Sequence, residues 1–213
     1  MTNVNRRPYR SPLRTEQSAQ SRAAVIAAAR ELFLSQGYAT TTVDQIAQRA
    51  GVSKPTVFNA VGNKARVLKT VRDVVMAGDD SPEPVTARRS VAAIAEAPDL
   101  DAAVRATVRH VVTLSQRYHG IHEVLRGAAQ VDPEMAALWT TAERERHVGA
   151  GHLLERLTRH AKPVVTRTRA QDQLWLLMAP DQYTRLVVDR AWTESAYRTY
   201  LERAIRAGIF GRT

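Results

Sequence analysis

Apolar residues recur every three or four positions along most of the chain, the spacing that places side chains on one face of an α-helix. The first such segment covers residues 16 to 35, and Gly37 follows it. Because glycine adopts the left-handed conformation at little cost, Gly37 is well placed to end this helix. The apolar positions of the segment are Val25, Ala28, Ala29, Leu32 and Phe33. Repeated through the later segments, this spacing predicts an all-α protein.

Two short helices are predicted between Thr40 and Lys64, in the sequence TTTVDQIAQRAGVSKPTVFNAVGNK. Thr41 or Thr42 can cap the first helix, and Gly51 is suited to end it. The apolar positions of the pair are Val43, Ile46, Ala47 and Ala50, then Val57 and Val61. Two short helices with a glycine turn between them favour a helix-turn-helix, which presents its second helix to a DNA major groove about 12 Å wide.

The second helix of this pair carries its own start signals. Ser53 can supply a capping hydroxyl, and Pro55 then falls in the first turn, where its missing N–H costs nothing. Asn63 can cap a fourth helix that continues to about Ala77. Its apolar positions are Val67, Leu68, Val71, Val74 and Val75. The sequence GDDSPEP, rich in acidic and turn-forming residues, then predicts a domain boundary.

Beyond this boundary, the spacing of apolar residues again predicts helices. Gly120 is expected to separate two of its helices, the segment that ends at His160 is expected to be the longest, and Ser195 is expected to cap the last. The predicted helices cover about residues 86–96, 104–118, 121–131, 133–160 and 170–178, followed by the last one. The expected domains are a disordered basic arm (1–14), a DNA-binding domain (15–78) and a second helical domain (79–213).

Positive charge is concentrated in the first 78 residues. They hold 12 Lys and Arg against 4 Asp and Glu, whereas the remaining residues hold 19 against 17. Such an excess attracts DNA phosphates through counterion release without selecting a sequence, whereas a merely soluble basic protein would spread its charge evenly. The amino-terminal arm, with Arg10 and Arg14, can enter a minor groove or only add charge, and both alternatives remain open.

The sequence lacks the signatures of common enzymes and cofactor sites. It has no cysteine, P-loop, GxGxxG, GxSxG or HExxH, so we expect no catalytic residue, no metal and no cofactor. The nearest approach to a metal cluster is HGIHE at 119–123, whose spacing favours an exposed or capping role. The longest apolar run, Leu174 to Pro180, is too short to span a bilayer, and no signal peptide is visible, which favours a soluble cytoplasmic protein.

A family signature accompanies the helical pattern between residues 20 and 70. Spaced positions there resemble the DNA-binding domain of TetR-family transcriptional regulators. These positions are Ile26, Ala28, Ala29, Leu32, Phe33, Gly37, Tyr38, Thr41, Thr42, Ile46, Ala47, Ala50, Gly51, Val52, Ser53, Thr56, Lys64 and Leu68. The resemblance implies a three-helix DNA-binding domain, a helical ligand-binding and dimerisation domain behind it, and repression relieved by a small molecule. It also implies that the fourth helix transmits ligand binding.

The same resemblance implies contacts with double-stranded DNA. Lys54 is the candidate for a guanine O6/N7 contact, and Asn59 for an adenine edge or a phosphate. Thr42 and Lys64 lie at helix starts, where they can bind phosphates. The full predicted set is Thr42, Ser53, Lys54, Pro55, Thr56, Phe58, Asn59 and Lys64, with Arg10 and Arg14 from the arm.

One part of this motif departs from the family pattern. The family commonly has Tyr, then His or Tyr, then Phe near the end of the recognition helix, where this chain has Phe58, Ala60 and Val61. Phe58 lacks the phenolic oxygen that usually binds a phosphate, and Ala60 offers no polar contact. We therefore expect the chain to hold the DNA backbone through fewer side chains than its relatives do.

Two further sites follow from the resemblance. An effector site is predicted at Val111, Ser115, Tyr118, Leu125, Trp139, Glu143, Arg146 and Trp175. Glu143 and Arg146 lie on or beside the apolar stripe of their helix, so they either face this site or pair with each other or reach solvent. A homodimer interface is predicted at Leu174, Leu177, Met178, Tyr197, Leu201, Ala204 and Ile205. Such a dimer matches a palindromic operator with half-sites about 34–36 Å apart.

Two other classes of function remain open. An architectural DNA-binding protein would use the same helices without an effector. A helical enzyme without signature motifs would leave the predicted helix-turn-helix unexplained.

Overall fold

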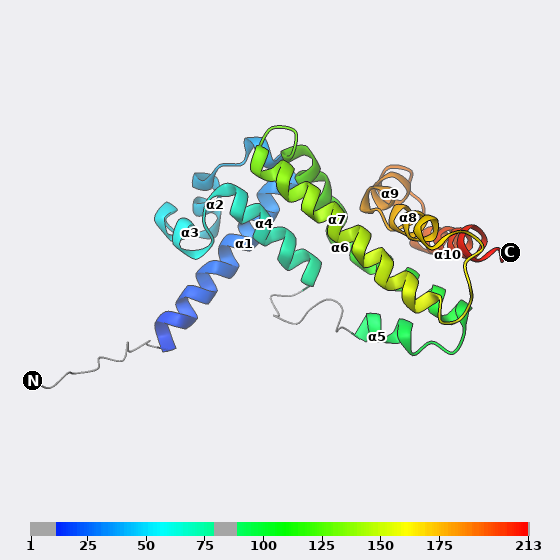
Figure 1. Ribbon diagram of the computed structural model, residues 1–213. Coiled ribbons are helices and arrows are strands. Elements are labelled where there is room, and N and C mark those ends of the chain that lie inside the picture. Colours follow the sequence, from blue (N-terminus) through cyan, green and yellow to red (C-terminus); the bar gives the residue numbers. More distant parts are fainter. Residues whose placement is uncertain (1–11, 79–88, 213) are drawn as a thin grey trace, which may run out of the picture. The chain divides into compact units, whose positions relative to one another are not determined.

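The computed structural model describes residues 12–78 and 89–212, and all regular structure in these ranges is helical (Figure 1). The predicted all-α class is therefore confirmed. The chain forms two compact units, one ending at Val71 and the other beginning at Arg72. This division lies inside helix α4 (Lys64–Ala77), ahead of the boundary predicted at residue 78. The buried Arg72 guanidinium binds Glu145 of the second unit, which explains why the unit begins before the turn-forming sequence.

The first unit is built from α1 (Pro12–Thr40), α2 (Val43–Ala50), α3 (Lys54–Ala60) and the first half of α4. Its most completely buried side chains are Val25, Ala29, Phe33, Ile46, Val57, Val67, Leu68 and Val71. These come from all four helices and include most of the apolar stripes read from the sequence. The helix-turn-helix therefore rests on a core that α1 and α4 complete.

Helix α1 begins earlier than the sequence predicts, whereas its other end agrees with the prediction. The helix begins at Pro12, so the last three residues of the predicted arm are helical, because the fixed φ of proline suits a first helical turn. The remainder of the arm lies outside the described residues. Near the other end, Gly37 leaves helical geometry with φ 79° and ψ 175°, as its position in the sequence predicted.

The second unit contains helices of very different length. Two long helices, α6 (Leu100–Ala128) and α7 (Pro133–Leu157), pack against the shorter elements (Figure 1). The shorter elements are α5 (Arg89–Ala95), α8 (Arg167–Leu177), α9 (Pro180–Tyr183), the π-helical turn η2 (Thr184–Asp189) and α10 (Glu194–Phe210). Asp99, Asp132, Thr166 and Thr193 accept backbone N–H groups as caps.

Three details of the second unit correct the sequence prediction. Gly120 does not interrupt α6, because Tyr118, Ile121 and Leu125 continue one buried face past it. With 29 residues, α6 is longer than α7, which has 25. Thr193 caps the last helix in place of Ser195, since its hydroxyl is the group that accepts the Ala196 N–H.

The core of the second unit joins residues that are far apart in the sequence. Apolar side chains of α6, α7, α8 and α10 form one cluster around residues such as Val104, Val112, Leu154, Leu174 and Tyr197. Among the residues described, no helix is both long enough and apolar enough to cross a membrane.

Candidate nucleic-acid interface and ligand cavity

The first helix of the helix-turn-helix is fixed at both ends by its own residues. At the start, the Thr42 hydroxyl accepts the Gln45 N–H at 3.2 Å, and the Gln45 side chain accepts the Thr42 N–H at 2.8 Å. This reciprocal arrangement is a capping box. At the end, Gly51 has φ 67° and ψ 29°, and the Val52 N–H donates to the carbonyl of Ala47 at 3.0 Å. The predicted cap and stop are both confirmed, with Thr42 as the capping threonine.

The second helix, α3, is fixed in the same local way. Ser53 caps it by accepting the Thr56 N–H at 3.3 Å, and Pro55 lies in its first turn. Val57 is fully buried and Val61 nearly so, which means that the inner face of α3 packs against the core of the first unit. Ser53 is thus a structural cap, and its contact with DNA stays a prediction.

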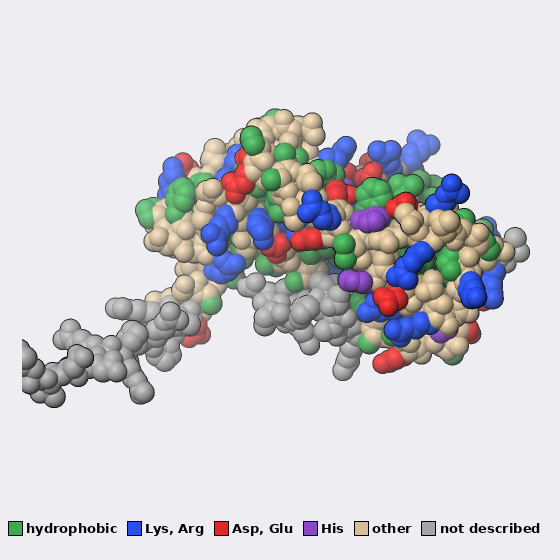
Figure 2. All heavy atoms as spheres, in the orientation of Figure 1, with side chains coloured by type: hydrophobic (Ala, Val, Ile, Leu, Met, Phe, Trp, Pro, Cys, Tyr) green, Lys and Arg blue, Asp and Glu red, His purple; other side chains and the backbone are tan. Residues whose placement is uncertain are grey.

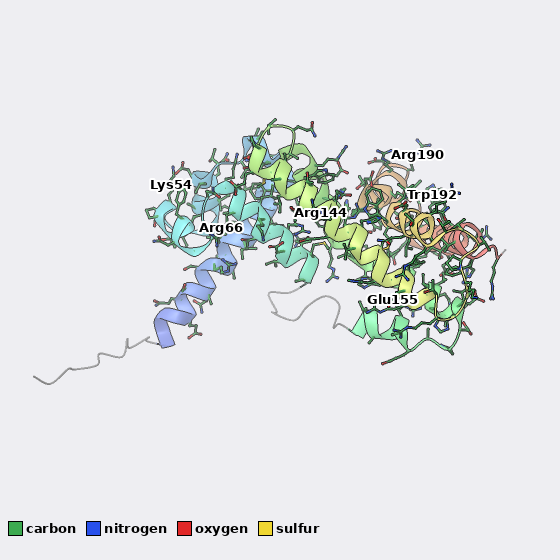
Figure 3. All side chains as sticks on the ribbon, in the orientation of Figure 1. Lys54, Arg66, Arg144, Glu155, Arg190 and Trp192 are labelled. Atoms are coloured by element: carbon green, nitrogen blue, oxygen red, sulfur yellow. The ribbon has the colours of Figure 1, made fainter. Side chains whose placement is uncertain are left out.

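The outer face of α3 is open to solvent. Lys54, Pro55, Phe58 and Asn59 are exposed, and Figure 3 shows Lys54 on α3 at the edge of the first unit. The Lys54 ammonium lies 2.9 Å from a carboxylate oxygen of Asp44, and both side chains are more than half exposed. Because exposed ion pairs contribute at most about 1 kcal/mol, Lys54 can exchange Asp44 for a base edge.

Helix α1 supports this face through a contact that the sequence reading missed. The Arg22 guanidinium donates to the carbonyl of Ala60 at 2.8 Å and so satisfies the last turn of α3. Arg22 lies three residues before Val25, on the buried stripe of α1. A basic residue on an apolar stripe was the available signal, since such a side chain needs a partner.

Lys64 is held by the residues that precede the helix-turn-helix. Its ammonium donates to the carbonyl of Tyr38 at 3.0 Å and lies 4.2 Å from the centre of the Tyr38 ring. This combination of a hydrogen bond and a cation–π contact fixes the charge at the start of α4. An ammonium has three N–H donors, so donors remain for a DNA phosphate.

The predicted contacts from the basic arm cannot be placed. Arg10 and the side chain of Arg14 lie outside the described residues. On the face shown in Figure 2, basic and acidic side chains alternate over the described surface, and no broad patch of one sign stands out.

The second unit contains an apolar cavity of about 220 Å³. Its apolar lining includes Met76, Val91, Val111, Leu114, Leu153 and Met178. Its polar lining includes Arg72, His110, Ser115, Tyr118, Glu145 and Arg146. Burial, together with the charges of Arg117 and Arg156, lowers the pKa of His110, so this imidazole is neutral at pH 7. A mostly apolar cavity with a few convergent polar groups is the usual form of a small-molecule site.

Half of the predicted effector residues line this cavity. Val111, Ser115, Tyr118 and Arg146 do so. The other four do not: Leu125, Trp139, Glu143 and Trp175. Leu125 is fully buried, and the Trp139 ring packs on the imidazole of His122 with centroids 4.9 Å apart. The helical spacing could not separate side chains that face a cavity from those that face a packed neighbour.

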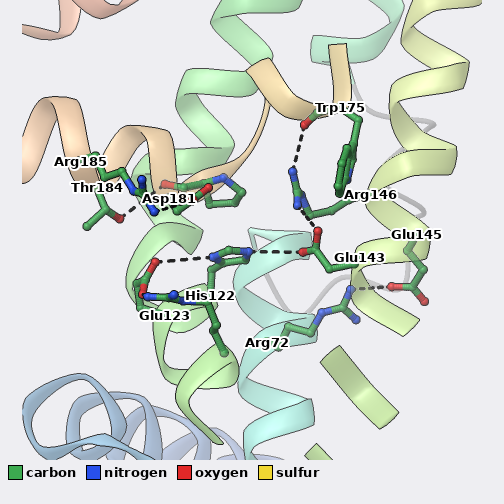
Figure 4. A network of polar contacts seen from close by, with 12 residues as sticks. Arg72, His122, Glu123, Glu143, Glu145, Arg146, Trp175, Asp181, Thr184 and Arg185 are labelled. Carbon is green, nitrogen blue, oxygen red and sulfur yellow. Dashed lines mark hydrogen bonds and ion pairs between the residues drawn. The ribbon is translucent and has the colours of Figure 1, made fainter. Parts of the chain in front are cut away.

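Glu143 and Arg146 pair with each other, one of the alternatives left open by the sequence. The Arg146 guanidinium donates to Glu143 at 2.5 Å and to the carbonyl of Trp175 at 3.1 Å (Figure 4). The other Glu143 oxygen lies 3.4 Å from Nε2 of His122. Burial alone would raise the pKa of Glu143, but the hydrogen bonds from His122 and Arg146 outweigh it and lower the pKa.

The histidines of HGIHE are not exposed as predicted. His122 is buried with only 3 % of its surface exposed, and His119 is partly buried against the ring of Tyr183. The apolar face of α6 continues through this segment and carries His122 inward. In the part of the chain that is described, no group of His, Asp and Glu is arranged to hold a metal ion.

Four of the seven residues of the predicted dimer interface are buried within their own chain, so their part in an interface stays a prediction. Leu174, Tyr197, Leu201 and Ile205 are buried in the core of their own chain, with at most 2 % exposed. The other three residues, Leu177, Met178 and Ala204, are partly exposed. The apolar stripes of α8 and α10 were correctly located, but they face inward because α6 and α7 supply partner surfaces for them.

The sequence and the fold both match known proteins. Residues 25–71 match the family described as bacterial regulatory proteins, tetR family. YdeS of Bacillus subtilis (strain 168), described as an uncharacterized HTH-type transcriptional regulator, is 32 % identical over 138 residues. The match covers 62 % of this chain and 62 % of YdeS, which is less than two thirds of that relative.

Solved structures resemble the chain over most of its length. NalD, the secondary repressor of the MexAB-OprM multidrug efflux pump in Pseudomonas aeruginosa, superposes with a TM-score of 0.68 at 21 % identity, covering 91 % of this chain and 98 % of NalD. The fatty acid degradation regulator FadR from Bacillus halodurans gives a TM-score of 0.66 at 16 % identity, with 87 % and 94 % covered. At such identities the likeness establishes the fold.

Proposed function

Because the chain belongs to the TetR family of bacterial transcriptional regulators, which are not enzymes, we propose that it is a sequence-specific repressor. It binds a palindromic operator as a homodimer and leaves the operator when a small molecule occupies the cavity. The observation that carries this proposal is the capped α2–turn–α3 pair, which buries Val57 and leaves Lys54, Phe58 and Asn59 exposed.

Repression and release by a ligand are supported by two observations. NalD, whose fold this chain shares, is described as a repressor of an efflux pump. The second unit of this chain holds an apolar cavity, part of whose wall is Arg72 and Met76 of α4. Since α4 also begins at Lys64, a ligand that shifts this helix would move a residue next to the helix-turn-helix. An architectural DNA-binding protein would have no use for such a cavity.

The proposed contacts divide into two kinds. Lys54 and Asn59 read base edges from the outer face of α3, where Pro55, Thr56 and Phe58 can touch a thymine methyl or a phosphate. Thr42 and Lys64 hold phosphates at the starts of α2 and α4. Phosphate contacts position the protein and set its affinity, whereas base contacts set its sequence preference.

The homodimer surface is proposed on the exposed side of α8 and α10. Leu176 is 59 % exposed, and Trp192 and Tyr200 are 39 % and 38 % exposed, which is unusual for such large side chains. The rings of Trp192 and Tyr200 contact each other edge to face with centroids 5.9 Å apart, and Figure 3 shows Trp192 beside these helices. This set replaces the buried residues that the sequence had suggested.

Selection of bound sequences from a random duplex library tests the proposal. A palindromic consensus is expected, because a symmetric dimer presents two equal α3 helices. Recovery of duplexes without a consensus would instead support an architectural role.

Two variants separate the two kinds of contact. Lys54→Ala is expected to change the selected consensus at one position of each half-site, whereas Lys64→Ala should weaken binding to all duplexes and reduce the salt slope by about one unit. Lys162→Ala, on an exposed loop of the second unit, is the matched control, since it removes the same charge from the unit that does not contain the helix-turn-helix. An unchanged consensus with Lys54→Ala would refute the role assigned to Lys54.

A further inference from the structure

Two hydrogen-bond donors at the wall of the cavity make no hydrogen bond of normal geometry among the described residues. They are the hydroxyl of Tyr118 and the Nε–H of Arg72. Both residues are buried, with 1 % and 7 % of their surface exposed. Because buried polar groups in native proteins are nearly always paired, two unpaired donors at one cavity indicate that the cavity receives an acceptor.

The two donors lie close enough to interact. The Arg72 guanidinium lies within hydrogen-bonding reach of the Tyr118 oxygen, although the contact falls outside normal hydrogen-bond geometry. In that contact the Tyr118 oxygen accepts, so the Tyr118 O–H proton still has no acceptor among the described residues. A single acceptor placed between them would satisfy both. A carboxylate suits this position best, because its oxygens only accept hydrogen bonds and a charged partner strengthens each bond.

The charges around Arg72 favour an anion over a cation. Arg72 donates through its other nitrogens to Asp73 at 3.0 Å and to Glu145 at 2.5 Å. Figure 4 shows the bond to Glu145. The side chain of Arg72 is 9 % exposed, but the side chains of Asp73 and Glu145 are 42 % and 57 % exposed. Water therefore screens the two carboxylates more than the buried guanidinium, and Arg146 and Arg156 add two further guanidinium groups to the lining of the cavity.

The remaining wall of the cavity sets the size and polarity of the ligand. Met76, Val111, Leu114 and Leu153 supply aliphatic surface. The volume of about 220 Å³ equals the liquid volume of about seven water molecules. It lies below the range of about 300–1,000 Å³ for drug-sized ligands, so the ligand is a small one.

We propose that the cavity binds a small organic acid, whose carboxylate bridges the Tyr118 hydroxyl and the Arg72 Nε–H and whose aliphatic body fills the space along α6 and α7. This inference rests on the proposed function, since it names the chemical class of the effector.

Titration calorimetry of the full-length protein with four compounds of one carbon skeleton tests the charge requirement. The compounds are cyclohexanecarboxylate, cyclohexanecarboxamide, cyclohexylmethanol and cyclohexylmethylamine. The carboxylate is expected to bind at least about ten times more tightly than each of the other three, because only it offers a charged acceptor. Equal or tighter binding of the amine or the amide would overturn the inference, as would the absence of carboxylate binding.

A matched pair of tyrosine variants tests the position of the carboxylate. Tyr118→Phe removes the proposed donor, and Tyr197→Phe removes another buried hydroxyl without a partner among the described residues, but one outside the cavity lining. Tyr118→Phe is expected to raise the Kd of the carboxylate about tenfold or more, and Tyr197→Phe to leave it unchanged. Melting of each variant without ligand confirms folding. Equal Kd values for the two variants would refute the assigned position.

Failure of this inference is distinguishable from failure of the proposed function. The duplex selection needs no ligand, so a palindromic consensus would uphold DNA recognition even if the carboxylate did not bind. Carboxylate binding that is lost in Tyr118→Phe would uphold the site even if no consensus emerged.

Discussion

The two units of this chain fix their functional residues in different ways. In the first unit, the starts of both helices of the helix-turn-helix are set by a side chain within three residues, Thr42 for α2 and Ser53 for α3. In the second unit, the cavity depends on residues far apart in sequence, such as Arg72 and Glu145. Helical spacing shows that a side chain lies on an apolar stripe, but the partner helix decides what that stripe faces. Local signals therefore locate a DNA-binding surface more reliably than a cavity or an interface.

The largest expected effect comes from substituting a buried residue of α10 and comparing it with its exposed neighbour. Leu201 is 1 % exposed and Tyr200 is 38 % exposed, although the sequence assigned Leu201 to the dimer interface. Leu201→Ala is expected to lower the free energy of unfolding by about 2–5 kcal/mol, since it leaves a cavity in the core. Urea denaturation measures this change.

Tyr200→Ala is the control on the same helix. It should change the unfolding free energy of the monomer by only about 0.5 kcal/mol, as surface substitutions do, and should weaken self-association in sedimentation experiments. The opposite pattern, a stable Leu201→Ala protein that no longer dimerises, would restore the original assignment.

A second comparison sets an ion pair of the second unit against one of the first. Glu143 is partly buried and binds both Arg146 and His122, whereas Glu31 and Arg49 form a pair with both side chains more than half exposed. Glu143→Gln is expected to lower the free energy of unfolding by about 1–3 kcal/mol at pH 7, because the bonds from Arg146 and His122 lose their charged acceptor. Glu31→Gln should produce no resolvable change in the same denaturation experiment.

The pH dependence of this effect follows from the lowered pKa of Glu143. A carboxylate whose pKa is lower in the folded than in the unfolded state stabilises the fold above its ordinary value of 4.5. That contribution is lost as the pH falls below 4.5 and through the folded pKa. The difference between wild type and Glu143→Gln should therefore shrink as denaturation is repeated from pH 7 down to pH 3. A constant difference would show that the bonds do not depend on the charge of Glu143.

The sequence predicts more of the first unit than of the second, for a physical reason. The caps at Thr42 and Ser53, the stop at Gly51 and the burial of Val57 could be read directly, because each depends on neighbours in the chain. The burial of Leu201 and the position of Trp139 depend on helices that the spacing alone does not orient. Arg22 was missed because its partner, the carbonyl of Ala60, belongs to another helix.

The smallest expected effects come from two glycines whose substitutions should act in opposite directions. A Cβ atom would meet nothing within 4 Å at either Gly51 or Gly127, so space does not distinguish them. Gly51 has φ 67°, whereas Gly127 lies inside the last turns of α6. Gly51→Ala should lower the free energy of unfolding by about 1 kcal/mol through left-handed strain, and Gly127→Ala should raise it by about 0.5–1 kcal/mol through helix propensity.

Hydrogen exchange resolved by residue can assign each of these changes to its own unit, which a single melting curve cannot do. Faster exchange in Gly51→Ala should be confined to α2 and α3 and should accompany weaker operator binding, because the turn between these helices sets the position of α3. Gly127→Ala should slow exchange at the end of α6 and leave operator binding unchanged. If Gly51→Ala were as stable as wild type, the local signals of the first unit would matter less than its packing, and the contrast between the two units would fail.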